Sequence, residues 1–258
     1  MNHNFELMTI EQVEKFLEES VELGVKKYYY TGGEPFMNKQ IFEILEKTML
    51  LGPATVLTNG MLIKPEHAGR LKEISDDSLY SLELRVSIDG YTEEMNDAIR
   101  GKGVFKKTMA GVKHLVDNDF FPIITITKTW VDKDDDIVLN GFIETLKSYG
   151  YTRPRLKILP SIKIGKEAVR TKGYDEHEFV TDEMLTGYEI SNLICANSRV
   201  ATNRGVYVCP ILIDSRDANL GSTLHEATKN FEIKHQACYT CYLFGAICSN
   251  FNAVGRDA

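Results

Sequence analysis

Apolar residues recur along the first 160 positions in two alternating patterns, one with helical spacing and one with short continuous runs typical of buried strands. The first helical pattern begins at a capping box over residues 9–12 and ends at Gly24. A tyrosine-rich run at 25–30 predicts a strand, and it leads into the glycine loop 31–35. The chain therefore starts with a helix and a strand that ends in a glycine loop.

The same unit repeats along the chain. Further strands are predicted at 54–57, 82–88, 123–127 and 156–159. Between them we expect a helix capped by Asn38 with Ile41, Phe42, Leu45 and Leu50 on its apolar side, a helix opened by Pro65, helical patterns through Met95 and over 105–116, and a helix over 137–149. This alternation favours parallel strands joined by right-handed helical crossovers, in an open doubly wound sheet or a full or partial barrel.

Polar residues and glycines follow three of the predicted strands, where the loops of such a sheet converge at one edge. They are Gly32, Gly33 and Glu34 after the first strand, Thr58 and Asn59 after the second, and Ser87 and Asp89 at the third, with Arg100 beyond it. The glycines permit close approach of a ligand to the backbone, the glutamate suits an ammonium group, and the arginine suits a carboxylate. The alternatives are a plain turn, a turn-initiating aspartate and a solvated surface arginine.

The net charge of -7 and the scattered basic residues argue against a nucleic-acid partner. No apolar stretch approaches the roughly twenty residues that a membrane span requires, and the N-terminus lacks the features of a signal peptide. We therefore expect a cytoplasmic protein.

All five cysteines lie in the last quarter of the sequence, which favours a local metal or redox site over a disulfide framework. Cys195 and Cys209 flank a predicted β-hairpin turn at 203–205, and Cys238 and Cys241 form a C-x2-C pair that we place on a tight loop. Four thiolates suit either a tetrahedral zinc ion or one [4Fe-4S] cube. Cys248 is a further ligand or a buried thiol.

Residues 30–36, with the glycine pair and Glu34, look like the glycine-glycine-glutamate motif of the radical S-adenosylmethionine (SAM) superfamily, and residues 86–90 with 98–101 resemble its fourth-strand signature. The resemblance implies that Glu34 and the glycine backbone hold the amino group of SAM. It implies that Ser87 and Arg100 reach the carboxylate or ribose, and that Thr58 and Asn59 border the cofactor.

The cysteine-rich tail resembles the twitch or SPASM extensions of the same superfamily, in which cysteines bind an auxiliary [4Fe-4S] cluster. The order of Gly205, Cys209-Pro210, Leu220-Gly221 and Ala237-Cys238 carries this resemblance. A full SPASM domain has more cysteines, and Asn252 stands where one is expected, so the resemblance implies one auxiliary cluster. The expected fold is α/β: a partial (β/α)6 TIM-like barrel without its first strand over 1–160, a connecting segment over 161–190, and a small β-hairpin plus helix domain over 191–258.

The superfamily holds its radical-generating [4Fe-4S] cluster with a Cys-x3-Cys-x2-Cys loop, and this sequence contains no such loop. We expect a truncated chain or a start codon assigned too late, with a naturally degenerate protein as the third explanation; the radical-SAM cluster then requires an upstream segment. In its full-length form the enzyme would abstract hydrogen from a peptide, protein or small molecule through a 5′-deoxyadenosyl radical, with electrons from a flavodoxin or ferredoxin. The alternatives are a non-catalytic binding or scaffold protein with a structural zinc or iron-sulfur tail, and a conventional α/β enzyme with a zinc tail.

Overall fold

The computed structural model of the chain describes residues 6–245. The chain divides into two compact units, Met1–Leu159 and Pro160–Ala258, each of which is described by itself.

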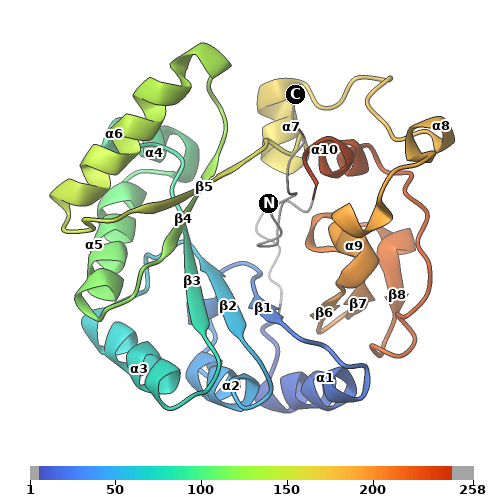
Figure 1. Ribbon diagram of the computed structural model, residues 1–258, viewed down its shortest axis with the longest axis horizontal. Helices are drawn as coiled ribbons and strands as arrows, with labels where there is room; N and C mark the ends of the chain where they lie inside the picture. Colours follow the sequence, from blue (N-terminus) through green and yellow to red (C-terminus); the bar gives the residue numbers. More distant parts are fainter. Residues whose placement is uncertain (1–5, 246–258) are drawn as a thin grey trace. The chain divides into compact units, whose positions relative to one another are not determined.

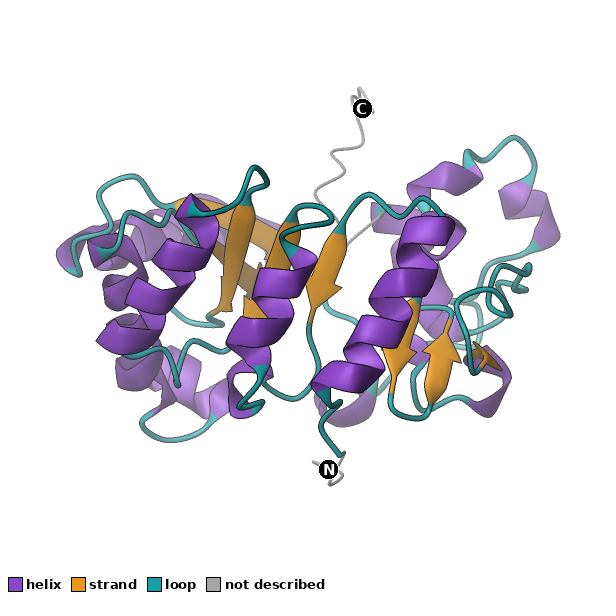
Figure 2. Ribbon diagram, turned by 90° about the horizontal axis from the view of Figure 1, so that it is seen from below, coloured by secondary structure: helices purple, strands orange, loops and turns teal. Residues whose placement is uncertain are grey.

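The first unit is a parallel five-stranded sheet in the order β1-β2-β3-β4-β5, with helices along one side of it (Figure 1). Figure 2 shows the strands of this unit backed by a row of helices. The elements in chain order are α1 (Ile10–Glu22), β1 (Tyr28–Tyr30), the 3-10 helix η1 (Pro35–Met37), α2 (Ile41–Thr48), β2 (Ala54–Thr58), α3 (Pro65–Asp76), β3 (Leu82–Ser87), α4 (Glu93–Arg100), α5 (Val104–Asp117), β4 (Ile123–Thr127), η2 (Asp132–Asp134), α6 (Asp135–Ser148) and β5 (Arg155–Leu159).

The core lies between the sheet and its helices. Every second residue of β3 enters this core, at Leu82, Leu84 and Val86, because side chains alternate between the two faces of a strand. Helix α5 packs especially close: a Cβ added at Gly111 would lie 2.0 Å from the carbonyl oxygen of Gly60, which leaves room only for glycine.

The opposite face of β3 carries polar side chains. Arg85 is only 1% exposed; its Nε donates to Glu83 Oε1 at 2.9 Å, and its guanidinium lies over the Tyr29 ring. Further along the same face, Ser87 is in register with Thr125 of β4. The alternation of β3 thus separates an apolar helix-facing side from a polar side.

The prediction of an α/β fold with five parallel strands is confirmed, and the predicted capping box at Thr9 is present. Two predicted details are wrong. The N-cap of the second helix is Gln40 rather than Asn38, which instead ends η1. Leu50 lies beyond the end of that helix, with 79% of its surface exposed. The helix ends at Thr48, before the glycine-proline pair at 52–53. Leu50 keeps the helical spacing of apolar residues, but it lies outside the helix and does not enter the core.

The second unit combines short helices with a small antiparallel sheet in the order β6-β7-β8. The hairpin of β6 and β7 pairs Thr202 with Gly205, so its turn is the two residues between them. The elements are α7 (Gly165–Thr171), α8 (Asp182–Leu185), η3 (Ile190–Asn192), α9 (Ile194–Asn197), β6 (Val200–Thr202), β7 (Gly205–Tyr207), η4 (Pro210–Leu212), η5 (Arg216–Ala218), β8 (Asn219–Gly221) and α10 (Gln236–Phe244).

Over residues 6–245, none of the helices combines the length and the apolar character needed to pass through a bilayer.

Candidate functional site

The loop after β1 is tied to the end of β2 by the carboxylate of Glu34, which is 6% exposed. Oε1 accepts hydrogen bonds from the Thr58 hydroxyl at 2.6 Å and from the Phe36 N–H at 3.2 Å, and Oε2 accepts from the Asn59 N–H at 2.8 Å. The structure therefore brings Glu34, Thr58 and Asn59 together, as the convergence of strand ends requires. Each carboxylate oxygen offers two acceptor sites, so these bonds leave Oε2 with capacity for one more donor.

The two glycines before Glu34 leave the backbone open. A Cβ built at Gly32 or Gly33 would meet no atom within 4 Å, so packing does not require glycine at either position. Gly32 also has a φ of 140°, which disfavours any side chain. The space beside the loop is thus available to a ligand that approaches the main chain.

Asp89, just beyond the end of β3, is committed to protein contacts. Its Oδ2 pairs with Arg100 Nη2 at 2.7 Å, and its Oδ1 accepts from the Thr127 N–H at 3.0 Å. Arg100 Nε is buried and has no hydrogen-bond partner among the described residues. A buried donor of this kind is costly to leave unsatisfied, so the guanidinium retains a donor for a group that the protein itself does not supply.

Three residues that the sequence motifs did not indicate also stabilise this edge of the sheet: Thr125, Asn96 and Asp97. The Ser87 hydroxyl lies 3.1 Å from that of Thr125, which links β3 to β4. Asn96, 1% exposed, accepts from the Asp89 N–H, and the carboxylate of Asp97 accepts from the Phe105 N–H at 2.8 Å. An asparagine and an aspartate inside a helical pattern are the available sequence signal, because such side chains usually bond to nearby backbone outside helix interiors.

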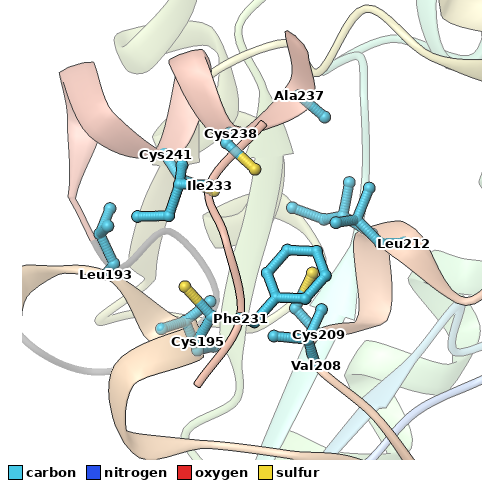
Figure 3. Close-up of a pocket in the computed structure, with 12 residues that line it drawn as sticks. Leu193, Cys195, Val208, Cys209, Leu212, Phe231, Ile233, Ala237, Cys238 and Cys241 are labelled. Atoms are coloured by element: carbon cyan, nitrogen blue, oxygen red, sulfur yellow. The ribbon is translucent and has the colours of Figure 1, made fainter. Parts of the chain in front are cut away.

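In the second unit, four cysteines line one pocket together with apolar side chains (Figure 3). The cysteines are Cys195, Cys209, Cys238 and Cys241, and within the part of the chain that the structure describes none of them forms a disulfide. The empty space among these side chains is small and partly open to solvent, and its enclosed part has room for about one water molecule. The four thiols thus border one small, mainly apolar pocket.

Burial dominates the thiol chemistry in this pocket. It raises the pKa of Cys238 to about 11, and the neighbouring Cys209 and Cys195 thiols add to the rise because adjacent thiolates repel. Burial also raises the pKa of Cys195. The thiols therefore lie close enough to interact electrostatically, although over residues 6–245 no three His, Cys, Asp or Glu side chains are gathered tightly enough to hold one metal ion.

The C-x2-C pair lies on a helix, so its predicted placement on a tight loop is wrong. Cys238 and Cys241 belong to α10, where a spacing of three residues puts both on one face. The segment before the hairpin holds this helix in place: the Tyr174 hydroxyl lies 2.6 Å from that of buried Thr240, and Tyr188 donates to the Tyr242 carbonyl at 3.2 Å. Cys248, the fifth predicted ligand, falls outside the described residues.

Comparison with known proteins gives a family match over more than half of the chain. The family model described as the radical SAM superfamily matches residues 1–138. Among curated relatives, the AdoMet-dependent heme synthase of Methanosarcina barkeri is 34% identical over 44% of this chain and 32% of its own length. The GTP 3',8-cyclase of Clostridium perfringens is 25% identical over 69% of this chain and 52% of its own length. The mycofactocin maturase MftC of Mycolicibacterium smegmatis is 27% identical over 60% of this chain and 38% of its own length. The matched region is at most about half the length of these relatives.

Solved structures share the fold at low identity. Native anSMEcpe with bound AdoMet superposes with a TM-score of 0.60 at 16% identity, covering 92% of this chain and 74% of that one. Streptococcus suis SuiB bound to S-adenosylmethionine superposes with a TM-score of 0.58 at 17% identity, covering 94% of this chain and 65% of that one. SuiB bound to its precursor peptide SuiA superposes with a TM-score of 0.51 at 20% identity, covering 68% of this chain and 38% of that one.

Proposed function

The chain belongs to the radical SAM superfamily, and from that premise we propose that it binds SAM at the edge formed by the carboxyl ends of β1, β2 and β3. When bound, SAM and the [4Fe-4S] cluster of this superfamily supply a 5′-deoxyadenosyl radical that abstracts hydrogen from a substrate. All cysteines of the sequence lie at or after Cys195, so the radical chemistry depends on cluster ligands that the sequence as given does not contain.

The open backbone at Gly32 and Gly33 is the observation that carries the proposal. An ammonium group there can donate to main-chain carbonyls and to the remaining acceptor site of Glu34 Oε2. On the neighbouring strand, Ser87 and the buried Nε of Arg100 offer donors to a carboxylate or ribose oxygen. Asp89 then acts as a positioning residue, because its carboxylate holds the guanidinium of Arg100.

We propose that the cysteine pocket holds an auxiliary [4Fe-4S] cluster. Four thiols, from α9, the N-cap of η4 and α10, border one mainly apolar pocket, and four thiolates are the ligand set that a [4Fe-4S] cube requires. Cys248 remains a predicted further ligand. Oxygen-sensitive clusters of this type suit a reducing, cytoplasmic compartment and a flavodoxin or ferredoxin as the electron donor.

For the substrate we propose a peptide or protein. The supporting observations are the fold shared with SuiB, whose structure contains a precursor peptide, and with anSMEcpe, whose structure contains the Cp18Cys peptide. A small-molecule substrate is the second candidate, because the heme synthase and GTP cyclase relatives share 34% and 25% identity with this chain, against 20% and 16% for the two peptide-bound structures.

The SAM site is tested by equilibrium dialysis of labelled SAM against wild type, Gly33→Val and Gly69→Ala. The valine side chain would enter space that the protein leaves open, so the variant should fold normally and bind SAM at least tenfold more weakly. Gly69→Ala, on α3, should bind as wild type does. Equal affinity of wild type and Gly33→Val would exclude the glycine loop as the SAM site.

The auxiliary cluster is tested by iron, sulfide and zinc analysis of anaerobically purified protein. Wild type should contain about four irons and four sulfides per chain, and a Cys238→Ala, Cys241→Ala double variant should lose them. About one zinc per chain without iron would favour a structural zinc tail instead.

A further inference from the structure

Arg199 lies between α9 and β6, and backbone carbonyls surround its guanidinium. Nη1 donates to the carbonyls of Cys195 at 2.6 Å and Ser198 at 2.7 Å. Nε donates to the Ala227 carbonyl at 2.8 Å, and Nη2 to that of Lys229 at 3.1 Å. The side chain thus connects the segment 195–198, which we call the Cys195 turn, to the segment 227–229.

All four acceptors are neutral carbonyls, so these contacts orient the guanidinium without neutralising its charge. Arginine keeps that charge at any pH the protein tolerates. The pocket beside it is lined only by apolar residues and cysteines. Arg199 is partly buried and donates to the Cys195 carbonyl, so its charge acts on groups inside this mainly apolar pocket with less screening than in bulk water.

Cys195 is itself a proposed cluster ligand, and Arg199 Nη1 donates to its carbonyl at 2.6 Å. A thiolate is the form in which cysteine ligates iron or zinc, so a cluster ligand at this position carries negative charge. The guanidinium therefore lies beside an anionic ligand when a cluster is bound.

We propose that Arg199 is a positioning residue for the auxiliary cluster, and that its fixed charge raises the reduction potential of that cluster. The inference rests on the proposed function, since it requires a cluster on Cys195, Cys209, Cys238 and Cys241. A cube held by four thiolates is anionic and gains one further negative charge when a one-electron donor reduces it. A nearby cation stabilises the more negative, reduced form, because net charge and surroundings set the potentials of such clusters.

The test is an anaerobic redox titration with dithionite, in which electron paramagnetic resonance measures the reduced cluster. Four proteins are compared: wild type, Arg199→Gln, Arg199→Lys and Arg204→Gln. Arg199→Gln removes the charge, and Arg199→Lys keeps the charge but loses the fork of donors. Arg204→Gln removes a positive charge from the β6–β7 turn, where Arg204 lies over Tyr207, and serves as the matched control.

We expect Arg199→Gln to change the ratio of oxidised to reduced cluster about tenfold at a given potential, which is a shift of about 59 mV to more negative values for one electron. Arg199→Lys should remain near wild type, and Arg204→Gln should not change the potential. Loss of iron from Arg199→Gln with retention in Arg199→Lys would also support a requirement for charge.

Three results would overturn the inference. An unchanged potential in fully loaded Arg199→Gln would remove the electrostatic role. Equal effects of glutamine and lysine, on potential or on iron content, would show that Arg199 only fastens the turn. A wild-type protein without iron and sulfide would instead refute the proposed cluster, and the inference would fall with it.

Discussion

The carboxylate of Glu34 should contribute to folding as well as to ligand binding. Replacing Glu34 with alanine removes three hydrogen bonds at once and leaves the N–H groups of Phe36 and Asn59 and the buried hydroxyl of Thr58 without their acceptor. Hydrogen bonds to charged groups contribute about 1.5–3 kcal/mol each, and their effects in one cluster are not additive. We therefore expect Glu34→Ala to lower the free energy of unfolding by about 3–4 kcal/mol.

Urea unfolding followed by tryptophan fluorescence measures this loss in the first unit alone. The chain has one tryptophan, Trp130, which packs against the core of that unit. With a slope on the order of 2 kcal/mol/M, the midpoint should fall by about 1.5–2 M. Thr58→Val removes one of the donors to Glu34 and also the acceptor of the Gly60 N–H, and it should lower the free energy of unfolding by about 2–3 kcal/mol.

Glu43→Ala is the matched control, because Glu43 is an exposed glutamate on α2. Its unfolding free energy should stay within about 0.5 kcal/mol of wild type. If Glu34→Ala unfolds at the same urea concentration as Glu43→Ala, the three bonds do not stabilise the strand ends and the reasoning is refuted.

Three further predictions concern packing, support and pH. Gly111→Ala should cost more than about 3 kcal/mol of unfolding free energy because of the close backbone approach at that position, whereas Gly69→Ala on α3 should gain about 0.5–1 kcal/mol; equal urea midpoints would contradict both. Tyr174→Phe should lower the hydrogen-exchange protection of α10 amides by about 1–2 kcal/mol, since buried Thr240 loses its partner, and unchanged protection would count against that support. Burial raises the pKa of Tyr30 to about 12, so unfolded chains deprotonate first as the pH rises above about 10. The free energy of unfolding should therefore fall between pH 10 and 12, more steeply in wild type than in Tyr30→Phe, and identical slopes in the two proteins would show that Tyr30 does not cause the loss.

Much of the first unit follows from the sequence because its signals are local. Five strands and the helices between them were predictable, since parallel strands read as short apolar runs and a capping box is visible at Thr9. The contact between Glu34 and Thr58 followed in outline, because parallel strands end at one edge. Its detail did not: nothing in the sequence indicates that three donors converge on one carboxylate.

Other features depend on contacts between residues far apart in the chain. Arg199 reads as an ordinary surface arginine, and its role at the Cys195 turn emerges only when segment 227–229 folds back against it. The C-x2-C pair is compatible with a loop or a helix, and contacts of α10 with distant tyrosines decide in favour of the helix. Sequence patterns identify which residues carry chemistry; long-range packing determines which atoms remain available for it.

The hydrogen bonds that hold α10 have a consequence for the order in which the chain folds and receives a cluster. Its contacts with Tyr174 and Tyr188 are made by protein groups alone, so the face that carries Cys238 and Cys241 takes shape as the chain folds. In small zinc-dependent domains the metal must supply the folding energy, and the apoprotein is unfolded. For the auxiliary cluster that we propose, iron delivery should therefore be a late step on an α10 that is already folded, and loss of iron by oxidation should leave this helix in place.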